Sequence, residues 1–274
     1  MSVTLRLMAF AFLASAPVAA AVFTVNDVSD AVDASPGNGV CATATGTCTL
    51  RAAVMETNAL IGTHTINLPA GLYTLTIPGT SEEWSATGDL NIRNDVSLVG
   101  AGPDLTVVDA RGIDRVFEVI GTARILGIAI RGGVALSPGN PFLGFSWAGG
   151  LIENLGTLSL TNCTLSGGRA VVGGAVWSGG LGTLSIDRCT IRDNDAENSD
   201  VGASNPTVGN YSKGGGLAVR TPTTITNSTI SGNWAQQGGG IEEEGGSVTL
   251  LNVTLSGNYG GPSWASSSAV LLRT

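Results

Sequence analysis

The chain has 274 residues, of which 43% are hydrophobic and 12% charged, with 40 glycines and a formal net charge of −8. This apolar content excludes a disordered chain, and glycine without a Gly-X-Y period excludes collagen. The 13 basic residues are scattered rather than clustered, which excludes a nucleic-acid-binding surface.

The first expected element is a secretory signal over residues 1–21. Arg6 supplies the positive start, residues 7–16 form an apolar stretch, and Ala19 to Ala21 are the small residues that a signal peptidase prefers. The alternative, a membrane anchor, needs a longer apolar run, and no later segment reaches that length. We therefore expect a secreted or cell-surface protein with no transmembrane span.

Residues 22–64 are expected to form an N-terminal cap that opens with a strand and an Asp-rich loop. Asp27, Asp30 and Asp33 in this loop precede a Pro-Gly turn. Calcium prefers several oxygen ligands, so the three carboxylates could bind it, although the spacing is not that of an EF-hand. The alternative, which we favour, is that the aspartates cap turns. No cofactor is required, and calcium is the one candidate.

Cys41 and Cys48 follow within the cap. Disulfides persist outside the cytosol, so we expect these neighbouring cysteines to form a local disulfide. A helix is predicted over 49–61, with Leu50 and Val54 on its apolar face, Glu56 on its outer face and Gly62 able to stop it. This helix is well placed to cover the first coil of the structure that follows.

From residue 65 a repeat appears in which short strands alternate with Asn and Gly. Equivalent positions are Cys163, Cys189, Ser228 and Val253, which by subtraction lie 26, 39 and 25 residues apart. A period of about 20–50 residues marks a stacked architecture. We therefore predict about eight β-coils over 65–274.

Within one coil, alternation predicts that Leu158, Leu160, Cys163 and Leu165 point inward and that Asn162 bends the chain. Three Asn-X-Ser/Thr sequences begin at this bend position, so the bend explains what otherwise resembles glycosylation sites. A second asparagine position is expected to adopt a left-handed turn and to hydrogen-bond along the stack; its members are Asn194, Asn233 and Asn258.

Cys163 and Cys189 occupy one repeat position on neighbouring coils. The strand spacing of about 4.8 Å would tolerate a disulfide. In-register side chains run parallel rather than toward each other, however, so we favour reduced thiols and leave the disulfide open.

Residues 22–60 resemble the CSLREA domain. The resemblance rests on Phe23 to Asn26, the Asp-rich loop and the run Cys48-Thr49-Leu50-Arg51-Ala52, in which Thr49 replaces Ser and Ala52 replaces Glu. The repeat Ile230 to Asn233, followed by Gly239 to Ile241, is similar to that of polymorphic outer membrane proteins. These resemblances imply a bacterial right-handed parallel β-helix of the pectin-lyase-like type, all-β with a short helical cap. They imply no particular reaction.

The 39-residue step contains an insertion of about residues 195–213, and insertions in stacked repeats emerge on one face, often the binding face. Arg188, Arg192, Asp193 and Asp195 lie at its root. In the resembled lyases, carboxylates hold calcium on the substrate and a basic side chain removes a proton. These four residues are therefore the catalytic candidates, although a solvated loop with weak surface ion pairs is favoured.

Candidates for substrate contact are Trp234, Tyr211 and Lys213, because exposed aromatic rings stack on sugars. The alternative is that such rings cover the flank of a coil. Arg220 and Glu244 each lie at the same distance in sequence from the glycine cluster before them. We therefore expect them to occupy equivalent positions on adjacent coils and to form an ion pair. The single histidine, His64, leaves no base for a Ser or Cys nucleophile.

The sequence therefore favours a non-enzymatic secreted or surface module that contacts an extracellular glycan or protein. The alternative is a polysaccharide lyase or hydrolase acting near residues 188–213. Clustering of the catalytic candidates with Glu242 in one cleft would favour the enzyme, and their dispersal the binding module. The final apolar strand, Ala269 to Leu272, has no cap after it, so we expect further structure to cover that end.

Overall fold

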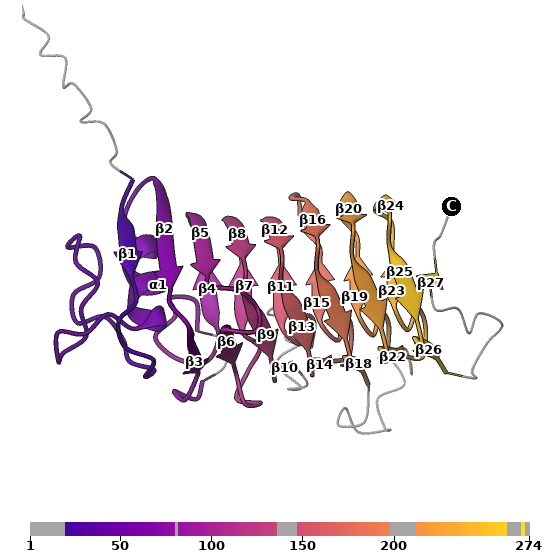
Figure 1. Ribbon diagram of the computed structural model, residues 1–274, viewed down its shortest axis with the longest axis horizontal. Coiled ribbons are helices and arrows are strands. Elements are labelled where there is room, and N and C mark those ends of the chain that lie inside the picture. Colours follow the sequence, from indigo (N-terminus) through magenta and orange to yellow (C-terminus); the bar gives the residue numbers. More distant parts are fainter. Residues whose placement is uncertain (1–19, 80–81, 136–146, 198–211, 262–269, 272–274) are drawn as a thin grey trace, which may run out of the picture.

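The computed structural model describes residues 20–79, 82–135, 147–197, 212–261 and 270–271, so nearly all of the expected signal at 1–21 lies outside the described residues. The chain forms a parallel β-helix of four parallel sheets, seen as a rod in Figure 1. Within the described ranges, no helix combines the length and the apolar character needed to cross a membrane. The predicted parallel β-helix is confirmed.

The four sheets are named A to D here, and their strands are given in spatial order. Sheet A contains β1 (Val22–Thr24), β2 (Thr63–Leu68), β5 (Asp95–Gly100), β8 (Thr122–Leu126), β12 (Thr157–Thr161), β16 (Leu184–Asp187), β20 (Thr223–Thr226) and β24 (Val248–Leu251). Sheet B contains β3 (Gly71–Thr74), β6 (Thr106–Asp109), β9 (Ala129–Arg131), β13 (Thr164–Ser166), β17 (Thr190–Arg192), β21 (Thr229–Ser231) and β25 (Thr254–Ser256). Sheet C contains β4 (Leu90–Ile92), β7 (Phe117–Val119), β11 (Ile152–Asn154), β15 (Val176–Ser178), β19 (Leu217–Val219), β23 (Ile241–Glu243) and β27 (Val270–Leu271). Sheet D contains β10 (Val134–Ala135), β14 (Arg169–Ala170), β18 (Asp195–Ala196), β22 (Trp234–Ala235) and β26 (Tyr259–Gly260).

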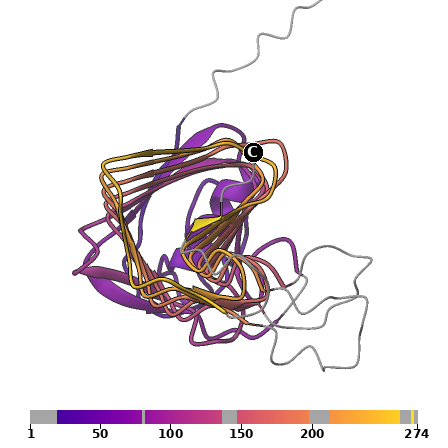
Figure 2. The same ribbon diagram turned by 90° about the vertical axis from the view of Figure 1, so that its right-hand side faces the viewer.

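Each complete coil passes through sheets A, B, D and C in that order, and the coils superimpose when the rod is viewed along its axis (Figure 2). The core consists of side chains that repeat in register. In sheet A, Leu98, Ile125, Leu160, Ile186 and Ile225 form one such row, and none is more than 1% exposed. Burying a side chain of this size stabilises the fold by about 1.5–3 kcal/mol. The stack therefore gains stability from each added coil.

The corner between sheets A and B is made by one residue with left-handed backbone. Asn162, Asn227 and Asn252 have φ of 50°, 50° and 55°, and Arg188 occupies the same place with φ 53°. Asparagine tolerates this region better than most residues. The predicted bend position is confirmed, and the repeated Asn-X-Ser/Thr pattern follows from it.

The second asparagine position differs from the prediction in one respect. The left-handed residue there precedes the asparagine: Asp193 and Gly232 have φ of 54° and 64°. Asn194 and Asn233 are instead buried, at 1% and 0% exposure, and form a ladder with Asn258. In this asparagine ladder, the side-chain amides of Asn194 and Asn233 each donate to the next side-chain oxygen at 2.9 Å. These bonds confirm the predicted hydrogen bonding along the stack. Their physical reason is that a buried amide needs hydrogen-bond partners.

The N-terminal end of the rod is covered by α1 (Leu50–Ala59), which lies beside β1 and β2 (Figure 1). Thr49 caps it by accepting a hydrogen bond from the backbone of Ala52, and the helix ends two residues earlier than predicted because Leu60 is extended. The outward position predicted for Glu56 is wrong. Glu56 is fully buried and accepts hydrogen bonds from the backbone N–H groups of Gly37 and Gly39, so it holds the glycine turn against the helix.

Arg51 joins two segments of the cap to the first coil. Its guanidinium is fully buried and forms an ion pair with Asp30 at 2.6 Å. It also donates to the backbone carbonyls of Ser85, Gly88 and Asp89. Because every charge and donor has a partner, this buried arginine fastens the Asp-rich loop and residues 85–89 to α1.

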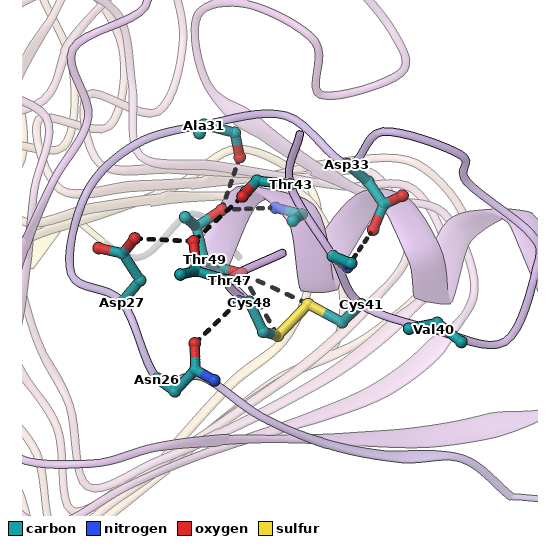
Figure 3. Close-up of a disulfide and its surroundings, with 12 residues drawn as sticks. Asn26, Asp27, Ala31, Asp33, Val40, Cys41, Thr43, Thr47, Cys48 and Thr49 are labelled. Carbon is teal, nitrogen blue, oxygen red and sulfur yellow. Dashed lines mark hydrogen bonds between the residues drawn. A yellow bond between two sulfur atoms is a disulfide. The ribbon is translucent and has the colours of Figure 1, made fainter. Parts of the chain in front are cut away.

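The four cysteines form one disulfide and one pair of thiols. Cys41 and Cys48 are bonded, as predicted, and the bond joins the loop to the start of α1 (Figure 3). Cys163 and Cys189 are free and 2% exposed, and the backbone N–H of Cys163 donates to Sγ of Cys189 at 3.3 Å. The reduced state that the sequence favoured is the one present.

The buried thiol pair gives a direct test of the stack. In native protein, Cys163 and Cys189 are expected to resist a thiol reagent, because both are enclosed in the core. Two thiols per chain should react after denaturation without reductant. Reaction of either cysteine in the native state, located by mass spectrometry, would contradict the packing of coils β12–β13 and β16–β17.

Candidate functional site

The three aspartates of the N-terminal loop point to different partners. Asp27 accepts hydrogen bonds from Thr47 and from backbone N–H, and these bonds lower its pKa, with the backbone bond contributing most. Asp33 bonds to two backbone N–H groups of its own loop, on another side of the disulfide (Figure 3). Asp30 pairs with Arg51. The structure does not bring them together, and no cluster of three potential metal ligands occurs within the described ranges.

The predicted catalytic candidates are dispersed around the rod. Arg188 lies at the corner between sheets A and B and pairs with its neighbour Asp187 at 2.8 Å. Arg192 ends a strand of sheet B and pairs with Asp193 at 2.6 Å, with both side chains more than half exposed. Asp195 belongs to sheet D and Glu242 to sheet C, where Glu242 is fully buried. These residues do not form one cleft.

Sheet D places four of its side chains in a row along the rod. Parallel pairing sets Arg169 beside Asp195, Asp195 beside Trp234, and Trp234 beside Tyr259. We call these four residues the sheet D row. Trp234 is half-buried, whereas Tyr259 is 55% exposed. The strands that carry Trp234 and Tyr259 pair directly and are about 4.8 Å apart, so the two aromatic residues are neighbours on consecutive coils.

The two charged residues of this row, Arg169 and Asp195, differ in whether their polar atoms have partners. Arg169 pairs with Glu197, so its charge is balanced locally. Asp195 has a buried Oδ1 with no hydrogen-bond partner, and burial raises its pKa despite the nearby Arg169. A desolvated carboxylate oxygen without a donor is costly.

Among the predicted contact residues, only Trp234 lies in this row. Tyr211 lies outside the described residues. Lys213 donates to Glu244 at 2.6 Å, and Arg220 pairs with the same carboxylate at 3.1 Å, which confirms the predicted Arg220–Glu244 pair. Burial opposes ionisation of Glu244, but Lys213 and Arg220 outweigh burial and lower its pKa. The sequence analysis did not identify Tyr259. The repeat shows that it is equivalent to Trp234, because each follows an asparagine of the ladder, Asn258 and Asn233 respectively.

A second group of charged residues, on the sheet C side, was also missed. We call it the Arg115 cluster: Arg115 with Asp89, Asp114, Glu118 and Glu153. Arg115 pairs with Asp89 at 3.3 Å and with Glu153 at 3.0 Å, and all three residues are less than 10% exposed. Burial raises the pKa of Glu153 to about 7, although Arg115 opposes this. Asp114, Arg115 and Glu118 lie on one coil, whereas Asp89 and Glu153 come from the coils on either side of it, so no local sequence pattern joins the whole cluster.

Comparison with known proteins adds a fold likeness only. No known family matches the sequence, and no characterised protein does so. A solved rhamnogalacturonan lyase is similar in structure, with a TM-score of 0.36 and 10% identity over 85% of this chain and 56% of the lyase. The chain thus spans little more than half the length of that lyase. The β-helix assignment rests on the chain's own parallel sheets.

Proposed function

We propose that the protein is a secreted or surface-exposed module of a bacterium that binds an extracellular glycan along the sheet D row. The observation that carries the proposal is the in-register pair of Trp234 and Tyr259 beside the half-buried carboxylate of Asp195. Aromatic rings supply a large apolar surface to the faces of sugar rings, and a carboxylate accepts hydrogen bonds from their hydroxyl groups.

The row runs along the rod, so the ligand that fits it is an extended chain. Successive strands place one side chain about every 4.8 Å. A linear polysaccharide lying parallel to the rod would therefore meet Tyr259, Trp234 and Asp195 in turn. A globular ligand would contact only part of the row.

Charge favours a neutral polymer. The chain carries a net charge of −8, Asp195 is acidic, and Arg169 is already paired with Glu197. A polyuronate would place its carboxylates against this surface without a free cation in the row, which is unfavourable. A lyase or hydrolase reading has less support, because Arg188, Arg192 and Glu242 lie on different sheets and corners.

Affinity electrophoresis with soluble polysaccharides tests the proposal. A neutral linear glucan is expected to retard the wild-type protein more than polygalacturonate does. Trp234→Ala and Tyr259→Ala are each expected to weaken binding about tenfold, since a stacked ring contributes on the order of 1.4 kcal/mol.

Trp84→Ala is the matched control. Trp84 is 63% exposed and lies against the guanidinium of Arg93, in the segment between β3 and β4, which contributes no strand to sheet D. Its replacement should leave retardation unchanged. Equal losses for Trp84→Ala and Trp234→Ala, or no retardation by any polymer, would refute the proposal.

A further inference from the structure

We propose that the Arg115 cluster is a pH-sensitive clamp that fastens the first coils to the N-terminal cap in acid and loosens as the pH rises toward neutrality. The clamp lies on the sheet C side of the rod, on residues that the proposed glycan site does not use. Asp89 directly precedes β4, Asp114 and Arg115 lie in the segment before β7, Glu118 lies in β7 and Glu153 in β11.

The geometry centres on one guanidinium. Arg115 contacts Asp89, which precedes β4, and Glu153, which lies in the middle of β11. Asp114 accepts a hydrogen bond from the backbone N–H of Arg115. Glu118 lies in sheet C between Asn91 and Glu153 and is paired in register with both. The two ion pairs use Nη1 and Nη2, and Nε of Arg115 is buried without a hydrogen-bond partner.

Charge balance makes the cluster titratable near neutral pH. Four carboxylates surround Arg115, and the next charged groups, Glu83 and Arg93, pair with each other. Burial disfavours charge on Arg115, yet the carboxylates raise its pKa, so it stays protonated. One positive charge cannot balance two buried and two half-buried negative charges, so a proton is retained on the carboxylates. Burial likewise raises the pKa of Asp89, Asp114 and Glu118.

The backbone connects this cluster to the cap. Asp89 follows Gly88, and the carbonyls of both residues accept hydrogen bonds from the fully buried guanidinium of Arg51 in α1. The carbonyl of Asp114 accepts from Val134, at the start of sheet D. Repulsion within the cluster would therefore act on the segments that hold the cap and the first turn of sheet D.

The closed cluster is less stable at higher pH because the native state retains a proton that the opened state releases. The pKa of Glu153 is about 7 in the folded protein, against an ordinary value of 4.5. Its protonation supports the closed cluster fully below about pH 4.5, and that support declines as the pH rises to about 7. For this one proton, the equilibrium constant for opening should rise roughly tenfold per pH unit across this window and level off above it.

Hydrogen exchange of the full chain from pH 5 to pH 8, corrected for the intrinsic exchange rate, measures this opening. Peptides covering 85–92 and 113–119 are expected to lose protection as the pH rises toward 7, while peptides from β20 and β21 stay constant. In Glu153→Gln the equilibrium constant for opening should no longer show the roughly tenfold rise per pH unit that Glu153 causes, because the amide cannot release a proton.

Glu244→Gln is the matched control, since Glu244 is a half-buried acid on the same side of the rod whose pKa is lowered. It should leave the trend intact. Glu118→Gln serves as a second test within the cluster and should also flatten the trend. An unchanged slope in both Glu153→Gln and Glu118→Gln, or an equal loss of protection along the whole rod, would overturn the proposal.

Discussion

Replacing Arg51 by methionine is expected to destabilise the protein by about 3–5 kcal/mol, the range found when one partner of a buried ion pair is removed. Methionine retains most of the side-chain volume, so the loss is electrostatic. Asp30 would stay buried without its cation, and the carbonyls of Ser85, Gly88 and Asp89 would lose their donor. The cap would then separate from the first coils.

Chemical unfolding followed by circular dichroism measures the effect, with Arg93→Met as the control. Arg93 is also paired, with Glu83, but its side chain is 30% exposed. Exposed pairs contribute about 0.2–1 kcal/mol, so the control should stay near the wild-type midpoint. Equal midpoints for both variants would show that Arg51 does not fasten the cap.

Replacing Asn233 by alanine is expected to cost about 2–4 kcal/mol, because it interrupts the asparagine ladder in its middle. Asn233 accepts from the side chain and backbone of Asn194 and donates to the carbonyl of Ile191 and to Asn258. Each buried group left without a partner costs about 1–3 kcal/mol. Thermal or chemical unfolding gives the value.

Asn258→Ala provides the comparison, since Asn258 lies at the exposed end of the same ladder and is half-buried. Water can replace part of what it loses, so its cost should be smaller than that of Asn233→Ala. The reverse order would contradict a ladder whose energy comes from burial.

The fold was predictable because one repeat position carries one physical role. The inward positions of Leu158, Leu160 and Leu165 follow from alternation, and the left-handed corner at Asn162 follows from the tolerance of asparagine for that backbone. The same logic misplaced Asn194 by one residue, because burial of the amide within the stack outweighs its preference for a left-handed turn.

The remaining features could not be predicted from local patterns. Glu56 and Arg51 are both buried because the glycine turn, Asp30 and residues 85–89 supply partners from distant segments. The Arg115 cluster joins Asp89 to Glu153 across three strands of sheet C. Trp234 and Asp195 were predicted as candidates separately, one for substrate contact and one for catalysis, and stacking places them together in one row with Arg169 and Tyr259.

The central claim is that the sheet D row binds a polysaccharide that the protein does not cleave. The most direct measurement follows a polysaccharide panel, neutral and acidic, after incubation with the full chain, with and without calcium. Polymer length is read by size-exclusion chromatography, unsaturated and reducing ends by colorimetric assay, and co-elution of protein with polymer reports binding. The account predicts co-elution with a neutral polymer of unchanged length, lost in Trp234→Ala. Shortened polymer or unsaturated ends, abolished by Arg192→Ala, would contradict it.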